Sequence, residues 1–284
     1  MDNRPRAILY MIAAAISFAM MGVFIKMASD LPVHEKVFFR NLISLFLAAI
    51  VILKTGHPFF GKLKNQPFLM ARSIFGLLGV ITFFYAIDNL LLVDADMLNK
   101  LSPFFVTIFA ALFLGEKLNI SKGLFLLVAF TGALLIIKPS FDLSMLPAIS
   151  GTLSAICAGA AYTLLRYLKN REQPETIVFY FSLISVVGLF PFLFFGARWP
   201  TFYEWPLLLG IGVSAAMGQF GLTLAYKQAP ASEVSIYIYT SILFSAIFGM
   251  LFFSEIPDMY SVIGGIMIIG AAVSSSWFAN SKKI

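Results

Sequence analysis

The sequence predicts an all-α integral membrane protein with about ten transmembrane helices, built as a five-plus-five inverted repeat. The first observation is composition, because 60% of the 284 residues are hydrophobic and only 12% are charged. A soluble domain is about half apolar and a quarter charged. The second observation is a series of apolar runs of spanning length, and the third is a set of motifs that recurs along the chain.

The apolar runs are separated by proline, glycine or charged residues, and each is long enough to cross a bilayer. About 20 helical residues at about 1.5 Å each span a hydrocarbon layer of about 30 Å. The first run is too long for the apolar part of a signal peptide, so we expect it to be retained. We predict spans near residues 7–28, 34–53, 67–87, 93–114, 119–137, 147–168, 175–196, 204–226, 232–253 and 258–279.

The basic residues between these spans divide unequally between the two sides of the membrane. Because the cytoplasmic side carries an excess of lysine and arginine, both termini are expected in the cytoplasm, and an even number of spans agrees. A cytoplasmic (inner) membrane is the expected location, with multiple crossings of the chain. The opposite side would hold Lys36, Lys138 and Arg198, and the cytoplasmic side Arg4, Arg6, Lys54, Lys62, Lys64, Lys117, Lys122, Lys169, Arg171, Lys227, Lys282 and Lys283.

The second half of the chain repeats features of the first at a nearly constant spacing. Five spans per copy is an odd number, so the two copies would have opposite orientations in the membrane. We therefore predict two units, residues 1–140 and 141–284, each of five helices. The matching positions are Pro67 with Pro206, Asp94 with Glu233 and Glu116 with Glu255 at a spacing of 139, and Lys26 with Arg166 and Glu35 with Glu175 at a spacing of 140.

A polar stripe marks the fourth predicted span. Asp96, Asn99, Lys100, Pro103 and Thr107 recur at three or four residues, which places them on one face of a helix. Ionisable groups in a spanning helix normally face the bundle interior or a water-filled cavity. We interpret the stripe as one wall of a solute pathway, with the first three as substrate-binding candidates. The alternative is a structural ion pair between Asp96 and Lys100, which are four residues apart.

Three further candidates lie in the second half. Gln219 in the eighth span has a glycine before it and another two residues after it, which allows a backbone or a ligand to approach closely. Tyr237 and Tyr239 lie in the ninth span, and Tyr239 is the repeat counterpart of Lys100. Equivalent helices of an inverted repeat meet near the midplane. We therefore expect Tyr239 and Lys100 to approach one cavity from opposite halves.

Two arginines inside predicted spans remain open between two interpretations. Arg40, in the first turns of the second span, would receive a substrate carboxylate or anchor the membrane interface. Arg72, about one turn into the third span, would contribute to the binding site or extend to the lipid headgroups. Four acidic residues at helix ends are assigned to structure, as caps or loop contacts: Asp94, Glu116, Glu233 and Glu255.

The sequence gives no reason to expect an enzyme, a metal or a cofactor. Its two histidines fall on opposite sides of the membrane, it has one cysteine, and no phosphate-binding glycine-rich loop follows a strand. The net charge of +6 is spread over the loops rather than clustered, which argues against nucleic acid. The expected partners are the lipid bilayer and a small-molecule substrate. A membrane-embedded lipid-handling protein or enzyme is the alternative function.

Two segments resemble a known family. The first copy is Phe84-Tyr-Ala-Ile-Asp-Asn-Leu-Leu-Leu-Val-Asp-Ala-Asp96, with Ser102-Pro103 and Phe113-Leu-Gly-Glu-Lys117 after it. It is similar to the hallmark segment of the drug/metabolite transporter superfamily, EamA type. Leu224-Ala-Tyr-Lys-Gln-Ala-Pro-Ala-Ser-Glu233 and Phe253-Ser-Glu255 resemble its second copy. The resemblance covers nearly the whole chain, as two EamA-like units.

The resemblance implies a secondary transporter that moves a small polar or amphiphilic organic metabolite by alternating access, with helices one to four and six to nine around a central cavity. The metabolite would be amino-acid-like, nucleoside-like or S-adenosylmethionine-like, the last because Phe38-Phe-Arg40-Asn41 and Arg72-Ser73 resemble importers of that compound. The fifth and tenth helices would be peripheral and would form any homodimer contact. The sequence agrees, since these two spans carry several glycines, which permit close helix packing.

Overall fold

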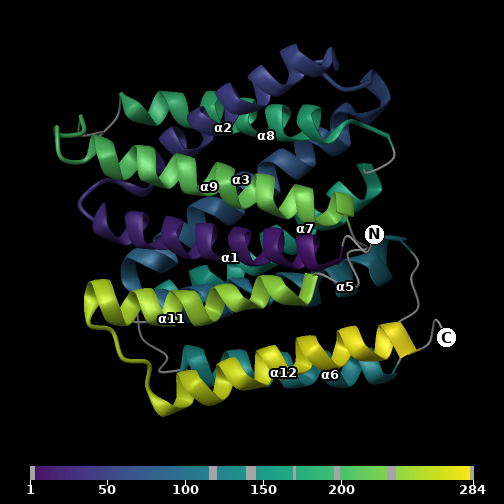
Figure 1. Ribbon diagram of the computed structural model, residues 1–284, viewed down its shortest axis with the longest axis vertical. Coiled ribbons are helices and arrows are strands. Elements are labelled where there is room, and N and C mark those ends of the chain that lie inside the picture. Colours follow the sequence, from purple (N-terminus) through teal and green to yellow (C-terminus); the bar gives the residue numbers. More distant parts are fainter. Residues whose placement is uncertain are drawn as a thin grey trace.

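The protein is an all-helical bundle in the computed structural model, which describes residues 4–114, 120–138, 145–168, 171–194, 199–228 and 235–281 (Figure 1). No strand occurs in these ranges. The predicted fold class is confirmed. The helices are α1 (Arg4–Met27), α2 (Val33–Thr55), η1 (Leu63–Asn65), α3 (Gln66–Asn89), α4 (Leu92–Asn99), α5 (Ser102–Leu114), α6 (Ile120–Ile137), α7 (Leu146–Leu168), α8 (Pro174–Leu189), η3 (Phe190–Leu193), α9 (Trp205–Gln228), η4 (Ser235–Tyr239), α11 (Thr240–Phe253) and α12 (Met259–Ser281).

The helix lengths fit a membrane protein. Within the described ranges, seven helical segments are long and apolar enough to cross a membrane, and three shorter apolar helices accompany them. Together they correspond to the ten predicted spans. α1 begins and α12 ends at the same end of the bundle in Figure 1, as an even number of crossings requires. We call this the terminal end, and the opposite end, where α1 finishes, the Lys26 end.

The prediction of one continuous fourth helix is wrong. α4 ends at Asn99 and α5 begins at Ser102, with a tight turn between them. In this turn the Leu101 N–H donates to the Leu98 carbonyl at 3.1 Å. Pro103, the second residue of α5, has no N–H and is favoured where a new helix begins. The ninth span is interrupted in a similar way, because the 3-10 helix η4 gives way to α11 after Tyr239.

The packing of the helices follows the inverted repeat. α1 packs on α9, and the equivalent pair from the exchanged halves, α7 and α3, packs in the same way. The contacts of α1 with α11 and of α7 with α5 form a second matching set. α2 packs on its own counterpart α8, and α6 on its counterpart α12. A pseudo-twofold axis through the bundle therefore relates the two halves, with α4 against α11 at its centre.

The fifth and tenth spans, α6 and α12, lie together along the lower edge of the bundle in Figure 1. Their contact depends on glycine, because a Cβ on Gly132 would lie 2.7 Å from the Gly264 carbonyl oxygen. Gly265 gives room to Met97 of α4 in the same way. Close packing, as expected from the sequence, is thus allowed by Gly132, Gly264 and Gly265. Gly123 and Gly270 face open space instead.

Ion pairs hold the Lys26 end together. Lys26 pairs with Glu255 across the two halves, and its ammonium also donates to the Leu90 carbonyl at 2.5 Å. Lys36 pairs with Asp88 at 2.6 Å, joining α2 to α3. A third pair, Lys138 with Asp258, joins the end of α6 to the start of α12, and the Lys138 hydrogen bond holds the pKa of the exposed Asp258 carboxyl below its usual value.

The prediction that Asp94 precedes its helix is wrong, although it lies in the first turn of α4, where a carboxylate is favoured by the helix dipole. α4 starts at Leu92, so Asp94 is its third residue, and Leu91 at the N-cap makes no side-chain cap. The Leu92 N–H instead donates to the Glu255 carboxylate at 2.7 Å. Glu255 therefore has the expected capping role, but for a helix of the opposite half. Glu116 and Glu233 lie outside the described residues, so their assignment stays a prediction.

Candidate functional site

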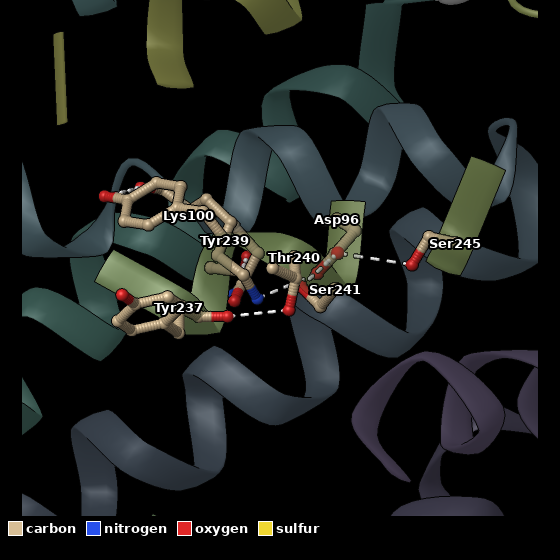
Figure 2. Close-up of polar contacts among 9 residues, drawn as sticks. Asp96, Lys100, Tyr237, Tyr239, Thr240, Ser241 and Ser245 are labelled. Carbon is tan, nitrogen blue, oxygen red and sulfur yellow. Dashed lines mark hydrogen bonds and ion pairs between the residues drawn. The ribbon is translucent and has the colours of Figure 1, made fainter. Parts of the chain in front are cut away.

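A buried polar cluster lies where the two interrupted spans meet (Figure 2). Its members, here named the Asp96 cluster, are Asp96, Lys100, Tyr239, Ser241 and Ser245. One Asp96 carboxylate oxygen pairs with the Lys100 ammonium at 3.0 Å. The other accepts hydrogen bonds from the Ser241 hydroxyl at 2.6 Å and the Ser245 hydroxyl at 3.2 Å. The cluster joins α4 of the first half to α11 of the second.

The helix interruptions place favourable partial charges on this cluster. Lys100 is the C-cap of α4, where the negative end of the helix dipole stabilises a positive charge. Ser241 is the second residue of α11, so its bond brings the Asp96 carboxylate to the positive end of that helix. Broken helices that offer their ends to charged groups near the midplane are a common basis for transporter binding sites.

Tyr239 and Lys100 meet as the repeat predicts. The Tyr239 hydroxyl donates to the Lys100 backbone carbonyl at 3.3 Å, a long hydrogen bond between residues 139 positions apart. This bond uses the backbone carbonyl of Lys100, and the Lys100 ammonium group pairs with Asp96. The two residues therefore approach one point from opposite halves. Their part in substrate binding stays a prediction.

The remaining candidates from these spans lie at the edge of the cluster or apart from it. Asn99 donates to the Ser154 hydroxyl of α7 at 3.0 Å. Tyr237 packs beside the first helix, and its carbonyl accepts from the Thr240 hydroxyl at 2.7 Å. Gln219 lies half-buried on α9, which α1 separates from α11 in Figure 1.

Arg40 and Arg72 form a second polar centre around one aromatic ring of α8. Their guanidinium carbons lie 5.7 Å and 4.4 Å from the centroid of the Phe181 ring. Arg40 donates to the Asn41 side-chain oxygen at 2.8 Å. Its Nε, and Nε and Nη1 of Arg72, are buried without a hydrogen-bond partner. The Arg72 guanidinium therefore packs against α8, and its part in a binding site stays a prediction.

Three residues of these centres were not among the sequence candidates. Ser241 and Ser245 are four residues apart in an otherwise apolar helix, so a helical-face pattern signals them. Phe181 has no such signal, because its role depends on α2 and α3 packing against α8. In the described residues, no three His, Cys, Asp or Glu side chains are grouped so that they could hold a metal ion.

The bundle thus contains two buried polar centres. A carboxylate, an ammonium and hydroxyl groups converge on one point, and two guanidinium groups on another. Comparison with known proteins gives the family. The sequence model of the EamA-like transporter family matches residues 5–138 and 145–277. The chain belongs to the EamA-like transporter family.

The relatives of this EamA-like chain are named as transporters. A pseudopaline exporter, CntI, of Pseudomonas aeruginosa is 37% identical over 97% of this chain and 98% of its own. Solute carrier family 35 member G1 of Homo sapiens is 26% identical over 96% of this chain and 80% of its own. A riboflavin transporter of Rhizobium johnstonii is 29% identical, covering 93% and 89% of the two chains.

A crystal structure with 16% sequence identity has the same fold. It aligns with a TM-score of 0.69 over 99% of this chain and 100% of its own. The EamA-like chain is therefore a multi-pass membrane protein of a transporter family, and its fold is that of a solved structure.

Proposed function

We propose that this chain is a secondary transporter, not an enzyme, which moves a small polar or amphiphilic organic metabolite by alternating access. The observation that carries the proposal is the meeting of two interrupted helices, one from each half, at the Asp96 cluster. A buried ion pair costs free energy in a membrane, and such groups mark solute pathways. Rocking of inverted halves about a site between them would expose that site to each side in turn.

The Lys26 end supplies the closed side of this cycle. The pair of Lys26 with Glu255, and the bond from the Leu92 N–H, join the two halves directly. Opening this end requires these contacts to separate. The repeat counterparts of Lys26 and Glu255 are Arg166 and Glu116, whose side chains lie outside the described part of the structure. We therefore predict an equivalent contact that closes the terminal end when the Lys26 end opens.

The moving units would be residues 1–140 and 141–284, in a cytoplasmic membrane with both termini in the cytoplasm. The excess of basic residues in the loops of the terminal end supports that orientation. A homodimer would form through α6 and α12, because Gly123 and Gly270 leave open space on these helices. Relatives named for pseudopaline and riboflavin support transport, and neither compound is assigned to this chain.

The substrate contacts would come from the candidates on both halves. Lysine offers a compact charge, and tyrosine a flat face with one hydroxyl. An amino-acid-like, nucleoside-like or S-adenosylmethionine-like solute has charged, polar or ring groups that would contact the lysine charge and the tyrosine ring and hydroxyl. The substrate-binding set is Asp96, Asn99, Lys100, Gln219, Tyr237, Tyr239, Arg40 and Arg72.

Reconstitution tests the function directly. Purified protein in liposomes should accumulate one or more labelled metabolites from a panel of these classes, and unlabelled solute trapped inside should accelerate entry by counterflow. Empty liposomes and liposomes with the Asp96→Asn variant are the controls. If no solute enters and lipids in the same vesicles are instead flipped or modified, the alternative of a lipid-handling protein or enzyme replaces the proposal.

A further inference from the structure

The two arginines around Phe181 carry positive charge that the surrounding protein does not balance. Across the described ranges, neither Arg40 nor Arg72 forms an ion pair with a carboxylate. The ionisable neighbour that interacts electrostatically with both is Tyr162 of α7. Arginine stays charged in proteins, so the imbalance cannot be removed by losing a proton.

The cost of this arrangement points to a missing ligand. Unpaired charges in a membrane bundle are unfavourable, and two like charges close together add to the cost. The two guanidinium carbons lie only 5.7 Å and 4.4 Å from the same Phe181 centroid, which keeps the two charges near each other. Cation–π contact with one ring recovers only a part of the hydration that each group loses. An anion bound between the arginines would balance the charge.

The surrounding residues provide hydrogen-bond donors for such an anion. Unpartnered N–H groups remain on Arg40 and Arg72, and the buried Ser185 hydroxyl on the Phe181 face of α8 also lacks a partner. Gly76 of α3 allows the Phe181 ring and the Arg72 guanidinium to pack close together, because a Cβ there would lie 2.9 Å from the ring and 3.2 Å from Arg72 Nη1. The centre is thus rich in donors, and acceptors are what it lacks.

We propose that Arg40 and Arg72, held over Phe181, form an anion site that takes a carboxylate of the transported solute. The inference rests on the proposed function and narrows it, because the substrate class becomes organic anions. The planar guanidinium matches the geometry of a carboxylate, and the Phe181 ring offers an apolar face to the carbon atoms next to it. A lipid phosphate has related chemistry, so the test separates the two sources.

Anion binding is measured without transport, using the full chain in nanodiscs of neutral phosphatidylcholine. Acetate, succinate, citrate and inorganic phosphate serve as probes against sodium chloride of equal ionic strength. We expect at least one carboxylate probe to raise the thermal unfolding temperature in a saturable way. Arg40→Gln and Arg72→Gln should each weaken its binding about tenfold or more, as expected for a lost charged hydrogen bond. Arg171→Gln removes the same charge at an exposed site and should change nothing.

A second measurement needs no variant. Phenylglyoxal modification of wild-type protein, read by mass spectrometry, should be slowed at Arg72 by the bound anion and unchanged at Arg171. Failure of every carboxylate to bind, or equal affinities in wild type and both Gln variants, overturns the proposal. It is also overturned if phosphatidylglycerol nanodiscs, with no soluble anion, protect Arg72 and the carboxylates do not. Uptake of only neutral or cationic solutes would refute the anion site and leave the transporter function standing.

Discussion

Replacing Asp96 with asparagine removes the partner of a buried lysine. The ammonium of Lys100 lies 3.0 Å from the carboxylate, and both side chains are about nine-tenths buried. At that separation and an effective dielectric constant of about 20, the attraction is about 5 kcal/mol, of which desolvation of the two charges offsets a part. Breaking a buried pair on one side costs about 3–5 kcal/mol, because the other charge is left without a partner.

The two single variants should differ in cost. Lys100→Met leaves a carboxylate that still accepts from Ser241 and Ser245, and it keeps the carbonyl to which Tyr239 donates. Asp96→Asn leaves an ammonium with no counter-charge from Asp96. We therefore expect Asp96→Asn to lower the free energy of unfolding by about 3 kcal/mol or more, and Lys100→Met to lower it less. The double variant should be more stable than Asp96→Asn alone, and both single variants should impair transport.

The measurement is a double-mutant cycle on unfolding free energies, obtained by titrating sodium dodecyl sulfate into mixed micelles. We expect a coupling of about 1.5 kcal/mol or more between Asp96 and Lys100. The exposed pair of Lys138 with Asp258 is the matched control, for which the coupling should stay below about 1 kcal/mol. Strictly additive losses for Asp96 and Lys100 would refute the account of a neutralised pair.

Cysteines introduced at Asn3 and Ser281, in a cysteine-free background, should resist an impermeant maleimide in intact cells and react after lysis; labelling of either without lysis contradicts cytoplasmic termini. Tyr239→Phe should weaken binding of a transported compound by about 0.5–1.5 kcal/mol and Tyr239→Ala by more, measured as uptake affinities, and unchanged affinities would remove this residue from the site. Gly264→Leu should force α12 off α6 and destabilise the protein by about 1–3 kcal/mol, whereas Gly188→Leu, at an exposed position of α8 with no close neighbour, should be nearly neutral; equal thermal unfolding temperatures would argue against the glycine contact.

Much of the fold could be predicted because a membrane restricts the choices. A span must be long, apolar and internally hydrogen-bonded, so spans follow from composition and length. The interruption after Asn99 was not predicted, although Pro103 signalled a helix start, because the apolar run continues through it. The position of Asp94 before its helix was predicted wrongly, because α4 already begins at Leu92 and Asp94 lies in its first turn.

The candidate site could be predicted only where neighbours lie close in sequence or are related by the repeat. Asp96 and Lys100 are one helical turn apart, and Tyr239 follows from the repeat spacing. The contact of Arg72 with Phe181 follows from neither relation, because the two residues are distant in the sequence and are not counterparts in the repeat. Only the packing of α3 against α8 creates it.

Alternating access requires the Lys26 end to open, and a cross-link across that end tests this requirement most directly. Ser29 and Ile256 are exposed neighbours of the Lys26–Glu255 pair, so cysteines there leave the pair itself intact. A cleavable bifunctional thiol reagent would join the two halves in a protein without other cysteines. We predict that uptake into proteoliposomes stops on cross-linking and returns on reduction, while each single-cysteine variant treated alike stays active. Undiminished uptake with the cross-link intact would contradict it.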